Sequence, residues 1–228
     1  MAVLAIACMA LIGLLGGSFN PAHRGHRRLS LAVCRALRLD QVWWLVSPGN
    51  PLKADSADMA PFAIRLASAR AMARRSAIRV SDVEFRLGTS FTIDTVRRLK
   101  LLYPQHKFIW LLGSDTLADF HKWRDWRGLA RTVPIAILPR PGYDRPAQAA
   151  RAMGWLRRFV HPPGQAYSWT EWSAPAIFFL RLPQDRTSAT AIRANNPHWH
   201  SRPAAAESQP RRPAGPVTTR NRLEPTSR

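Results

Sequence analysis

The feature that most limits the possible folds is an apolar run that passes without a break into a glycine turn. Residues 11–15 are continuously apolar, as expected of a strand buried on both faces of a parallel sheet, and Gly16, Gly17 and Ser18 follow directly. After the turn, a helical apolar pattern and a second apolar run complete a strand–helix–strand unit. Such a unit predicts a right-handed parallel crossover.

The same alternation continues along the chain. Helices are predicted over residues 61–75 and 92–102, and further strands over residues 42–46, 78–80, 107–112, 133–138 and 176–182. Repeated strand–helix alternation is typical of an open, doubly wound sheet. We therefore expect a Rossmann-like α/β fold, with a parallel sheet and helices on both of its faces.

The domain boundary is expected near residue 195. Residues 1–195 carry the strand–helix pattern and are predicted to form one domain. Residues 196–228 are rich in Pro, Ala, Ser and Arg and show no periodicity. Because such a segment cannot bury enough apolar surface to offset its ordering entropy, we expect a basic, disordered tail over 196–228.

Charge, cysteine content and the first residues narrow the class of protein. The net charge of +20 fits either attraction to polyanions such as nucleic acid or a site for phosphorylated substrates. Cys8 and Cys34 lie in apolar stretches, which predicts buried, reduced thiols and fits a cytoplasmic location.

No basic residue precedes Arg24, and the first apolar run is too short to span a bilayer. We therefore expect this run to form a buried strand, and we expect no membrane association.

The strongest chemical signal is the segment GGSFNPAHRGH, from Gly16 to His26. It lies between the first strand and the first helix, where doubly wound folds bind nucleotides. The glycines let the backbone approach a phosphate, and the helix offers free N–H groups and its positive dipole end to an anion. His23 and His26 share one face if they lie on a helical turn, so both can donate hydrogen bonds to a reacting phosphorus centre.

This segment resembles the T/HxGH signature of the nucleotidyltransferase superfamily, and its longer form is similar to that of the bacterial nicotinate-mononucleotide adenylyltransferases. The resemblance covers roughly residues 10–195. It implies adenylyl transfer from ATP to nicotinate mononucleotide in NAD biosynthesis, giving nicotinate adenine dinucleotide and pyrophosphate. It further implies that His23 and His26 are catalytic and that Asn20 contacts the mononucleotide. The ATP contacts implied in this segment are Gly16, Gly17, Ser18, Phe19, His23 and His26.

A second segment, SATAIR, ends at Arg193 and follows a predicted strand. Its first residue, Ser188, can cap a helix whose N–H groups form a second anion site. Arg193 can then reach the β- or γ-phosphate as a planar fork. The segment is similar to the family's SxTxxR motif, although Ala189 stands where a second serine is often found. The resemblance assigns Ser188, Thr190 and Arg193 to ATP binding, and Arg193 to catalysis as well.

Two further residues are assigned to ATP by the resemblance. Asp115 closes the segment GSD after an apolar run, and a carboxylate at the carboxyl end of a strand can bind ribose hydroxyls. The family carries G-x-D at this place, while a helix N-cap is the alternative interpretation. Lys53 follows a proline-rich turn where relatives have a basic residue. Its alternatives are phosphate binding and an ordinary solvated surface position.

Two residues are assigned to the mononucleotide. The family places a tryptophan shortly after the aspartate, and here Trp123 occupies that place. An indole face can stack on a pyridinium ring, although Trp123 and Trp126 could equally be packing residues. Thr92 ends the segment SFT, which resembles a family S-Y/F-T segment that contacts the same half of the product.

The implied reaction is in-line attack by a phosphate oxygen of the mononucleotide on the α-phosphorus of ATP, without a covalent enzyme intermediate. Catalysis would rest on positioning and electrostatic stabilisation. Mg²⁺ is expected on the ATP phosphates, and no residue is assigned as a metal ligand. The alternatives are an adenylyltransferase for nicotinamide mononucleotide or phosphopantetheine and, in another class, a basic nucleic-acid-binding protein, which would leave the phosphate motifs unexplained. The sequence is compatible with a homo-oligomer.

Overall fold

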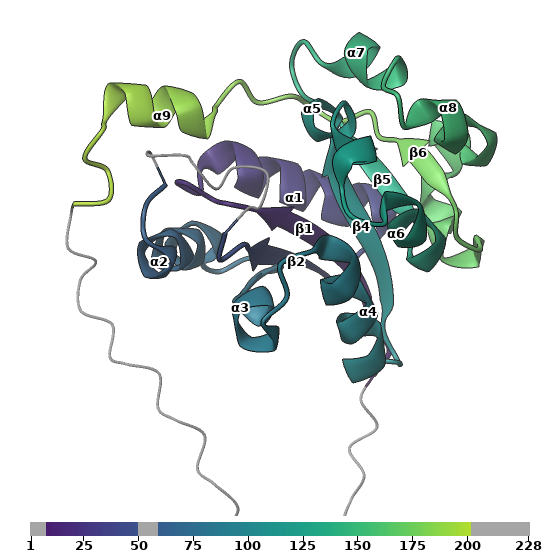
Figure 1. Cartoon of the computed structure of the whole chain (residues 1–228), viewed down its shortest axis with the longest axis horizontal. Coiled ribbons are helices and arrows are strands. Elements are labelled where there is room, and N and C mark those ends of the chain that lie inside the picture. The colour runs from purple at the N-terminus through teal and green to yellow at the C-terminus, as the bar shows by residue number, and fades with distance from the viewer. Residues whose placement is uncertain (1–7, 50–58, 202–228) are drawn as a thin grey trace, which may run out of the picture.

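A single parallel sheet forms the centre of the protein (Figure 1). The computed structural model describes residues 8–49 and 59–201. Six apolar runs form its strands, and each pairs in parallel with its neighbours. The strands are β1 (Leu11–Gly17), β2 (Gln41–Val46), β3 (Ile78–Ser81), β4 (Lys107–Gly113), β5 (Ile135–Leu138) and β6 (Ile177–Phe179).

The strand order places a switch point beside the glycine turn. The order is β3-β2-β1-β4-β5-β6, so the chain builds outward in one direction from β1 and then returns to begin again at β4. In open α/β sheets, ligands bind outside the carboxyl ends of the strands at such a point. The turn after β1 and the turn after β4 therefore flank the expected ligand crevice, and the predicted Rossmann-like fold is confirmed.

Helices connect the strands. The long ones agree with the sequence patterns, and α4 covers the predicted residues 92–102. One expected strand end was wrong, and one helix was not predicted. The last strand stops at Phe179 instead of continuing to residue 182, and the five-residue helix α3 was not predicted. The helices are α1 (Arg24–Leu37), α2 (Phe62–Ala73), α3 (Val83–Leu87), α4 (Thr92–Leu102), α5 (Ser114–Leu117), α6 (Trp126–Thr132), α7 (Asp144–Gln148), α8 (Met153–Leu156) and α9 (Ala189–Asn195), with 3-10 turns η2 (Phe120–Lys122), η3 (Arg157–Phe159) and η4 (Pro163–Glu171).

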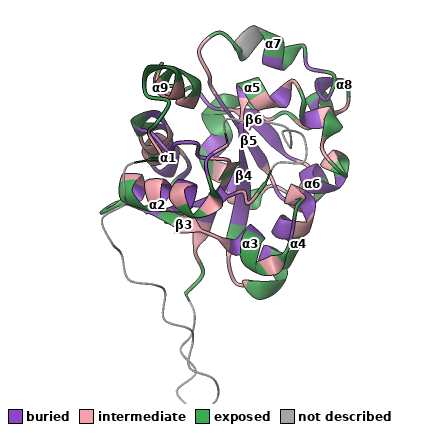
Figure 2. Cartoon of the chain, turned by 60° about the vertical axis from the view of Figure 1, so that its left-hand side comes forward, coloured by how far each residue is buried: buried purple, intermediate pink, exposed green. Residues whose placement is uncertain are grey.

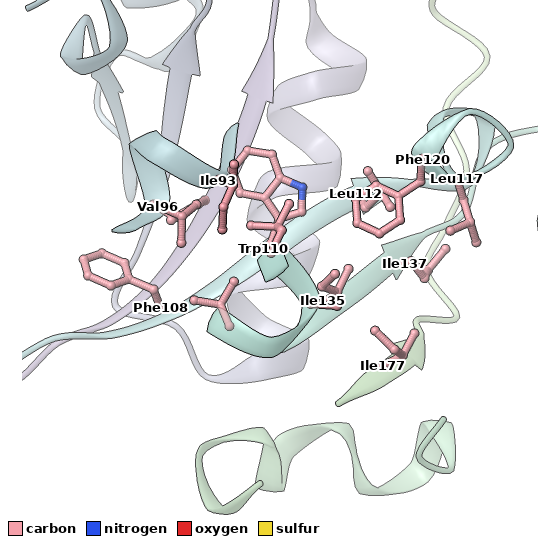
Figure 3. Close-up of a cluster of buried hydrophobic side chains, with 14 of the residues drawn as sticks. Ile93, Val96, Phe108, Trp110, Leu112, Leu117, Phe120, Ile135, Ile137 and Ile177 are labelled. Atoms are coloured by element: carbon pink, nitrogen blue, oxygen red, sulfur yellow. The ribbon is translucent and has the colours of Figure 1, made fainter. Parts of the chain in front are cut away.

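Alternate residues of the strands enter two separate cores, one on each face of the sheet. On β4, Trp110 belongs to the core that also holds residues of α4, α6 and α8, whereas its neighbour Leu111 belongs to the core that holds residues of α1 and α2. Figure 3 shows the first of these cores, where Ile93 and Val96 of α4 meet the side chains of Trp110 and other strand residues. Burying an aliphatic or aromatic side chain of this size contributes about 1.5–3 kcal/mol, so the two cores hold the strand ends in place.

Burial follows this layered arrangement (Figure 2). The strands are largely buried, whereas α9 has no buried residue and lies on the surface beside α1. Cys34 is buried in the core as expected, but Cys8 is exposed, because it precedes β1 instead of lying within it. In the described ranges, no helix has the length and apolar character needed to cross a membrane.

Candidate active site

Two histidines meet at the N-terminus of α1. His23 is the N-cap residue of this helix, with extended backbone angles, and His26 lies in its first turn. The backbone N–H of His23 donates a hydrogen bond to Nδ1 of His26 at 3.3 Å. Their ring centroids are 3.8 Å apart. The predicted juxtaposition of the two rings is therefore confirmed, although one ring belongs to the cap and the other to the helix.

Both imidazoles are held in the neutral state. Burial, followed by the charge of Arg140, lowers the pKa of His23 to about 4, against a smaller opposite effect of Asp185. Burial, followed by the neighbouring His23 and then Arg140, holds the pKa of His26 well below its ordinary value. Burial dominates because the charged form loses hydration that the surrounding side chains do not replace. Neutral rings here can donate hydrogen bonds to a phosphate without carrying a charge into the core.

The residues of the turn after β1 face the site through their backbone. The Phe19 side chain is buried and stacks on Trp44, with 4.9 Å between ring centroids. A Cβ atom at Gly16 would lie only 2.9 Å from the indole of Trp110. Gly16 is thus required by the packing beneath it, independently of any ligand above it. Ser18 completes the turn, half-buried.

The second motif reaches the same turn from the other end of the chain. Ser188 caps α9 by accepting a hydrogen bond from the N–H of Ala191 at 3.1 Å, which confirms the predicted cap, and Thr190 is exposed. Arg193 Nη1 donates to the carbonyl of Asn20 at 2.8 Å. Asn20 is buried, and its side-chain oxygen accepts a hydrogen bond from the N–H of Ala60. The structure therefore joins Arg193 to the histidine turn, a contact between residues 173 positions apart.

A polar clamp fixes the segment before α9 against α1. Arg24 Nε donates to the hydroxyl of Thr187 at 3.0 Å, and Arg28 pairs with Asp185 at 3.0 Å. Asp185 also accepts from the N–H of Thr187 at 2.8 Å. A Cβ at Gly25 would lie 3.3 Å from the Thr187 carbonyl, so the glycine lets this segment approach the helix closely. Sequence reasoning missed the clamp, although its residues flank both motifs.

Asp115 lies after β4, on the other side of the switch point. The predicted alternative for it, a helix N-cap, is wrong, because the N-cap of α5 is Gly113 and Asp115 lies within the first turn. Its Oδ1 is 3.8 Å from Nε of Arg140. The backbone N–H of Arg140 is anchored by the hydroxyl of Ser114 at 2.9 Å. Arg140 was also missed by sequence reasoning, although it lies two residues after a predicted strand, where ligand-binding residues gather.

Trp123 and Thr92 lie over the opposite face of the sheet from α1. Trp123 is half-buried and packs edge-on against Trp110 and Phe120, with ring centroids 6.2 and 5.4 Å away. Trp110 also packs beneath Gly16, so it lies between Trp123 and the turn after β1. Thr92 is the first residue of α4 and half-buried, and none of its contacts joins it to the histidines. Lys53 lies outside the described residues, as does most of the predicted tail, residues 202–228.

The site has buried side-chain nitrogens that make no hydrogen bond within the protein. Three buried side-chain nitrogens there lack a hydrogen-bond partner, namely His23 Nδ1, Arg140 Nε and Arg193 Nε. Buried polar groups are normally paired, so these nitrogens are free to bind a polar ligand. Across the described parts of the chain, no three His, Cys, Asp or Glu side chains gather as they would to hold a metal ion. The donor set therefore favours phosphate oxygens over a cation.

A cavity of about 820 Å³ opens at the carboxyl ends of β4, β5 and β6. Ser114, Ile137 and Leu180 contribute to its lining, together with Pro139, which precedes Arg140. Its volume falls in the range that holds drug-sized or cofactor-sized ligands. A mainly apolar cavity next to the segment that carries Arg140 can take a ligand with a flat ring at one end and phosphates at the other.

Comparison with known proteins shows which family this chain belongs to. The family model described as cytidylyltransferase-like matches residues 14–195. A protein of Erythrobacter litoralis (strain HTCC2594), named "Probable nicotinate-nucleotide adenylyltransferase", is 56% identical over 191 residues, covering 83% of this chain and 86% of its own. A protein of the same name from Gluconobacter oxydans (strain 621H) is 52% identical over 182 residues, covering 80% and 93%.

Solved structures share the fold. The Plasmodium falciparum nicotinic acid mononucleotide adenylyltransferase complexed with NaAD superimposes with a TM-score of 0.60 at 18% identity, covering 81% of this chain and 83% of its own. The same enzyme complexed with APC gives a TM-score of 0.59 at 17% identity, with the same coverage. At this level of identity, the likeness supports the arrangement of sheet and helices alone.

Proposed function

Since the chain belongs to the cytidylyltransferase-like family, together with relatives named nicotinate-nucleotide adenylyltransferases, we propose that it transfers the adenylyl group of ATP to nicotinate mononucleotide. The products are nicotinate adenine dinucleotide and pyrophosphate. The reaction belongs to NAD biosynthesis, and we place the enzyme in the cytoplasm.

The observation that carries this proposal is the contact between two neutral imidazoles at the N-terminus of α1. Arg193 is tied to the same turn through the Asn20 carbonyl. Helix N-termini attract anions through free N–H groups and the macrodipole, and α1 is 14 residues long. A polyphosphate placed here meets donors from both ends of the chain.

The chemistry follows from these donors. A phosphate oxygen of the mononucleotide attacks the α-phosphorus of ATP, the new P–O bond forms, and the bond to the β-phosphate bridging oxygen breaks in line. His23 and His26 donate hydrogen bonds to oxygens whose charge grows in the transition state. Arg193 neutralises the departing pyrophosphate, and Arg140 adds positive charge beside the rings. No protein nucleophile is needed, because positioning and electrostatic stabilisation suffice for this class of transfer.

Mg²⁺ enters the proposal through the substrate. Because no cluster of three metal-ligating side chains occurs in the described residues, the ion would be held by ATP phosphates and water, as Mg²⁺ often is. When bound, it withdraws negative charge from the triphosphate. The imidazoles and the arginines of this chain fit that arrangement, because they donate hydrogen bonds to phosphate oxygens and leave the ion to the phosphates and water.

We assign the two substrates to different residues of the site. The cavity next to the segment that carries Arg140 suits the adenine and ribose, and Asp115, which is exposed and follows the lining residue Ser114, can bind ribose hydroxyls. Trp123 offers a half-exposed indole for the pyridinium ring, to which it is attracted by the ring's positive charge. Thr92, at the start of α4, contributes to the mononucleotide side. With these assignments, the phosphate of the mononucleotide would lie between Trp123 and the histidines.

The test is a comparison of acceptors. Pyrophosphate release would be measured from ATP and Mg²⁺ with nicotinate mononucleotide, nicotinamide mononucleotide and phosphopantetheine, each under the same conditions. We expect rapid release with nicotinate mononucleotide and much slower release with the other two. Preference for another acceptor would contradict the assignment of Trp123, and absence of release with all three would contradict adenylyl transfer altogether.

A further inference from the structure

One guanidinium lies buried beneath the turns that follow β1 and β2. Arg65, on α2, is 1% exposed. Its Nη1 donates to the carbonyls of Ser18 at 2.7 Å and Ser47 at 2.8 Å. Nε donates to the Ala60 carbonyl at 2.9 Å, and Nη2 to the Pro48 carbonyl at 3.1 Å. A single side chain therefore joins three separate segments of backbone at the carboxyl end of the sheet.

All three nitrogens of the Arg65 guanidinium donate hydrogen bonds. The guanidinium carries donors in a rigid planar fork, and here four hydrogen bonds end on four neutral carbonyls. No carboxylate of the described residues lies within ion-pair distance of Arg65. Among the described residues, its positive charge is offset by peptide dipoles and by the ring of Phe62, whose centroid lies 5.6 Å from Cζ of Arg65. Burial lowers the pKa of Arg65, but an arginine stays protonated at any ordinary pH.

The hydrogen bonds orient the peptide groups of both turns. In a trans peptide the C=O and the N–H point in opposite directions. When Arg65 draws the carbonyl of Ser18 towards α2, it turns the N–H of Phe19 away from α2. The bond to Pro48 does the same for the N–H of Gly49. Phe19 has φ +47°, a conformation that residues with a side chain rarely adopt, and the hydrogen bond to the preceding carbonyl helps to hold it.

We propose that Arg65 is a positioning residue for catalysis, which fixes the turn after β1 relative to the turn after β2. The inference rests on the proposed function, because the turn after β1 carries the histidines that would contact the α-phosphate. Arg65 itself touches no substrate. Through its bond to the Ser18 carbonyl, it fixes the position and orientation of the backbone between Ser18 and His23. It also holds Ala60, whose N–H donates a hydrogen bond to the side-chain oxygen of Asn20.

The consequence is a specific kinetic effect. Substrate binding is spread over many contacts, whereas in-line transfer requires close alignment of the reacting atoms. A misplacement of about 1 Å can cost on the order of a hundredfold in rate. Loss of the Arg65 contacts should therefore lower kcat much more than it raises KM. A purely structural role would instead lower the fraction of folded protein and leave kcat per folded molecule unchanged.

The decisive variant is Arg65→Lys. A lysine keeps the charge, but its single ammonium group cannot reach carbonyls on three segments together. Arg65→Met would leave four buried carbonyls unpaired and risks unfolding, so it is less informative. We expect R65K to stay folded, with kcat lower by about 10- to 100-fold and KM for ATP changed by less than about threefold. The control is Arg70→Lys, an exposed position on the same helix, which should leave both constants unchanged.

A second readout does not depend on activity. Amide hydrogen exchange at Phe19 and Gly49 should be faster in R65K than in the wild type, and unchanged in R70K. The inference is overturned if R65K keeps wild-type kcat, or if its loss equals the unfolded fraction seen by circular dichroism. If the wild type releases no pyrophosphate, the proposed reaction fails, while the exchange rates still decide whether Arg65 orders the two turns.

Discussion

The ring centroids of His23 and His26 are 3.8 Å apart, and the N–H of His23 donates to Nδ1 of His26. That hydrogen bond decides the tautomer of His26, because a neutral imidazole that accepts at Nδ1 carries its proton on Nε2. Nε2 of His26 is then a donor. Nδ1 of His23 is buried without a partner. The pair therefore keeps hydrogen-bonding capacity for a substrate, which a structural pair would have satisfied internally.

Replacing His23 tests this capacity directly. His23→Ala removes one donor from the transition state and leaves the N-cap backbone in place, so we expect kcat to fall by about 100-fold or more, with a smaller change in KM. Steady-state pyrophosphate release measures both constants. His198→Ala, at an exposed position, is the control. Near wild-type turnover in His23→Ala would contradict the assignment of the site.

Stability should depend on pH because of the same residue. His23 titrates at about 4 in the folded protein and at 6.5 in its reference state, so the unfolded chain binds the proton first as the pH falls. The stabilisation that comes from the neutral His23 ring should therefore be fully present above pH 6.5. As the pH falls from 6.5 to 4, the free energy of unfolding should decline by up to about 1.4 kcal/mol per pH unit. Urea unfolding at several pH values measures the slope. His23→Gln should make the slope shallower, and an unchanged slope would argue against a buried neutral ring.

The sequence predicted the sheet well, because strands buried on both faces appear as apolar runs whatever their partners. Residues 42–46 and 107–112 were identified in this way, and both are strands. The failures are short elements. Helix α3 has five residues and ends at Gly88 in the left-handed region, and its pattern is too short to show a helical period. β6 ends at Phe179, although Leu180 still donates a backbone hydrogen bond to the Ile137 carbonyl of β5 at 2.9 Å.

The site was predicted where it is local in sequence. His23 and His26 belong to one segment, and Ser188 with Arg193 to another, so the resemblance found them. Arg140 and Arg65 act through contacts with residues far away in the chain, and a lone arginine has no pattern that indicates burial. Only the fold shows that Arg65 meets carbonyls from three segments.

The clamp on α9 provides a third prediction. Asp185 accepts from Thr187 and pairs with Arg28, and chiefly the hydroxyl of Thr187 lowers the pKa of Asp185 to about 2, so it stays ionised in any ordinary assay. Asp185→Ala should loosen the segment that carries Arg193 and raise KM for ATP roughly three- to tenfold, the effect of one or two ordinary hydrogen bonds. Asp82→Ala removes a similar pair elsewhere. An equal effect of both variants would show that the clamp has no special role.

Glu84 should make stability fall as the pH rises, which is the opposite of the effect of His23. It is 8% exposed, and burial raises its pKa to about 7, against a smaller effect of its hydrogen bond from Thr95. The folded protein therefore keeps the proton longer than the unfolded chain, whose carboxyl titrates near 4.5. The contribution of Glu84 to stability should be greatest below pH 4.5 and decline as the pH rises to about 7.

Glu84→Gln mimics the protonated acid, so it should raise the free energy of unfolding at about pH 8 by on the order of 2 kcal/mol and change it little near pH 5. Thermal melts at both pH values measure this difference, and destabilisation at pH 8 would show that the carboxylate is needed in its charged form.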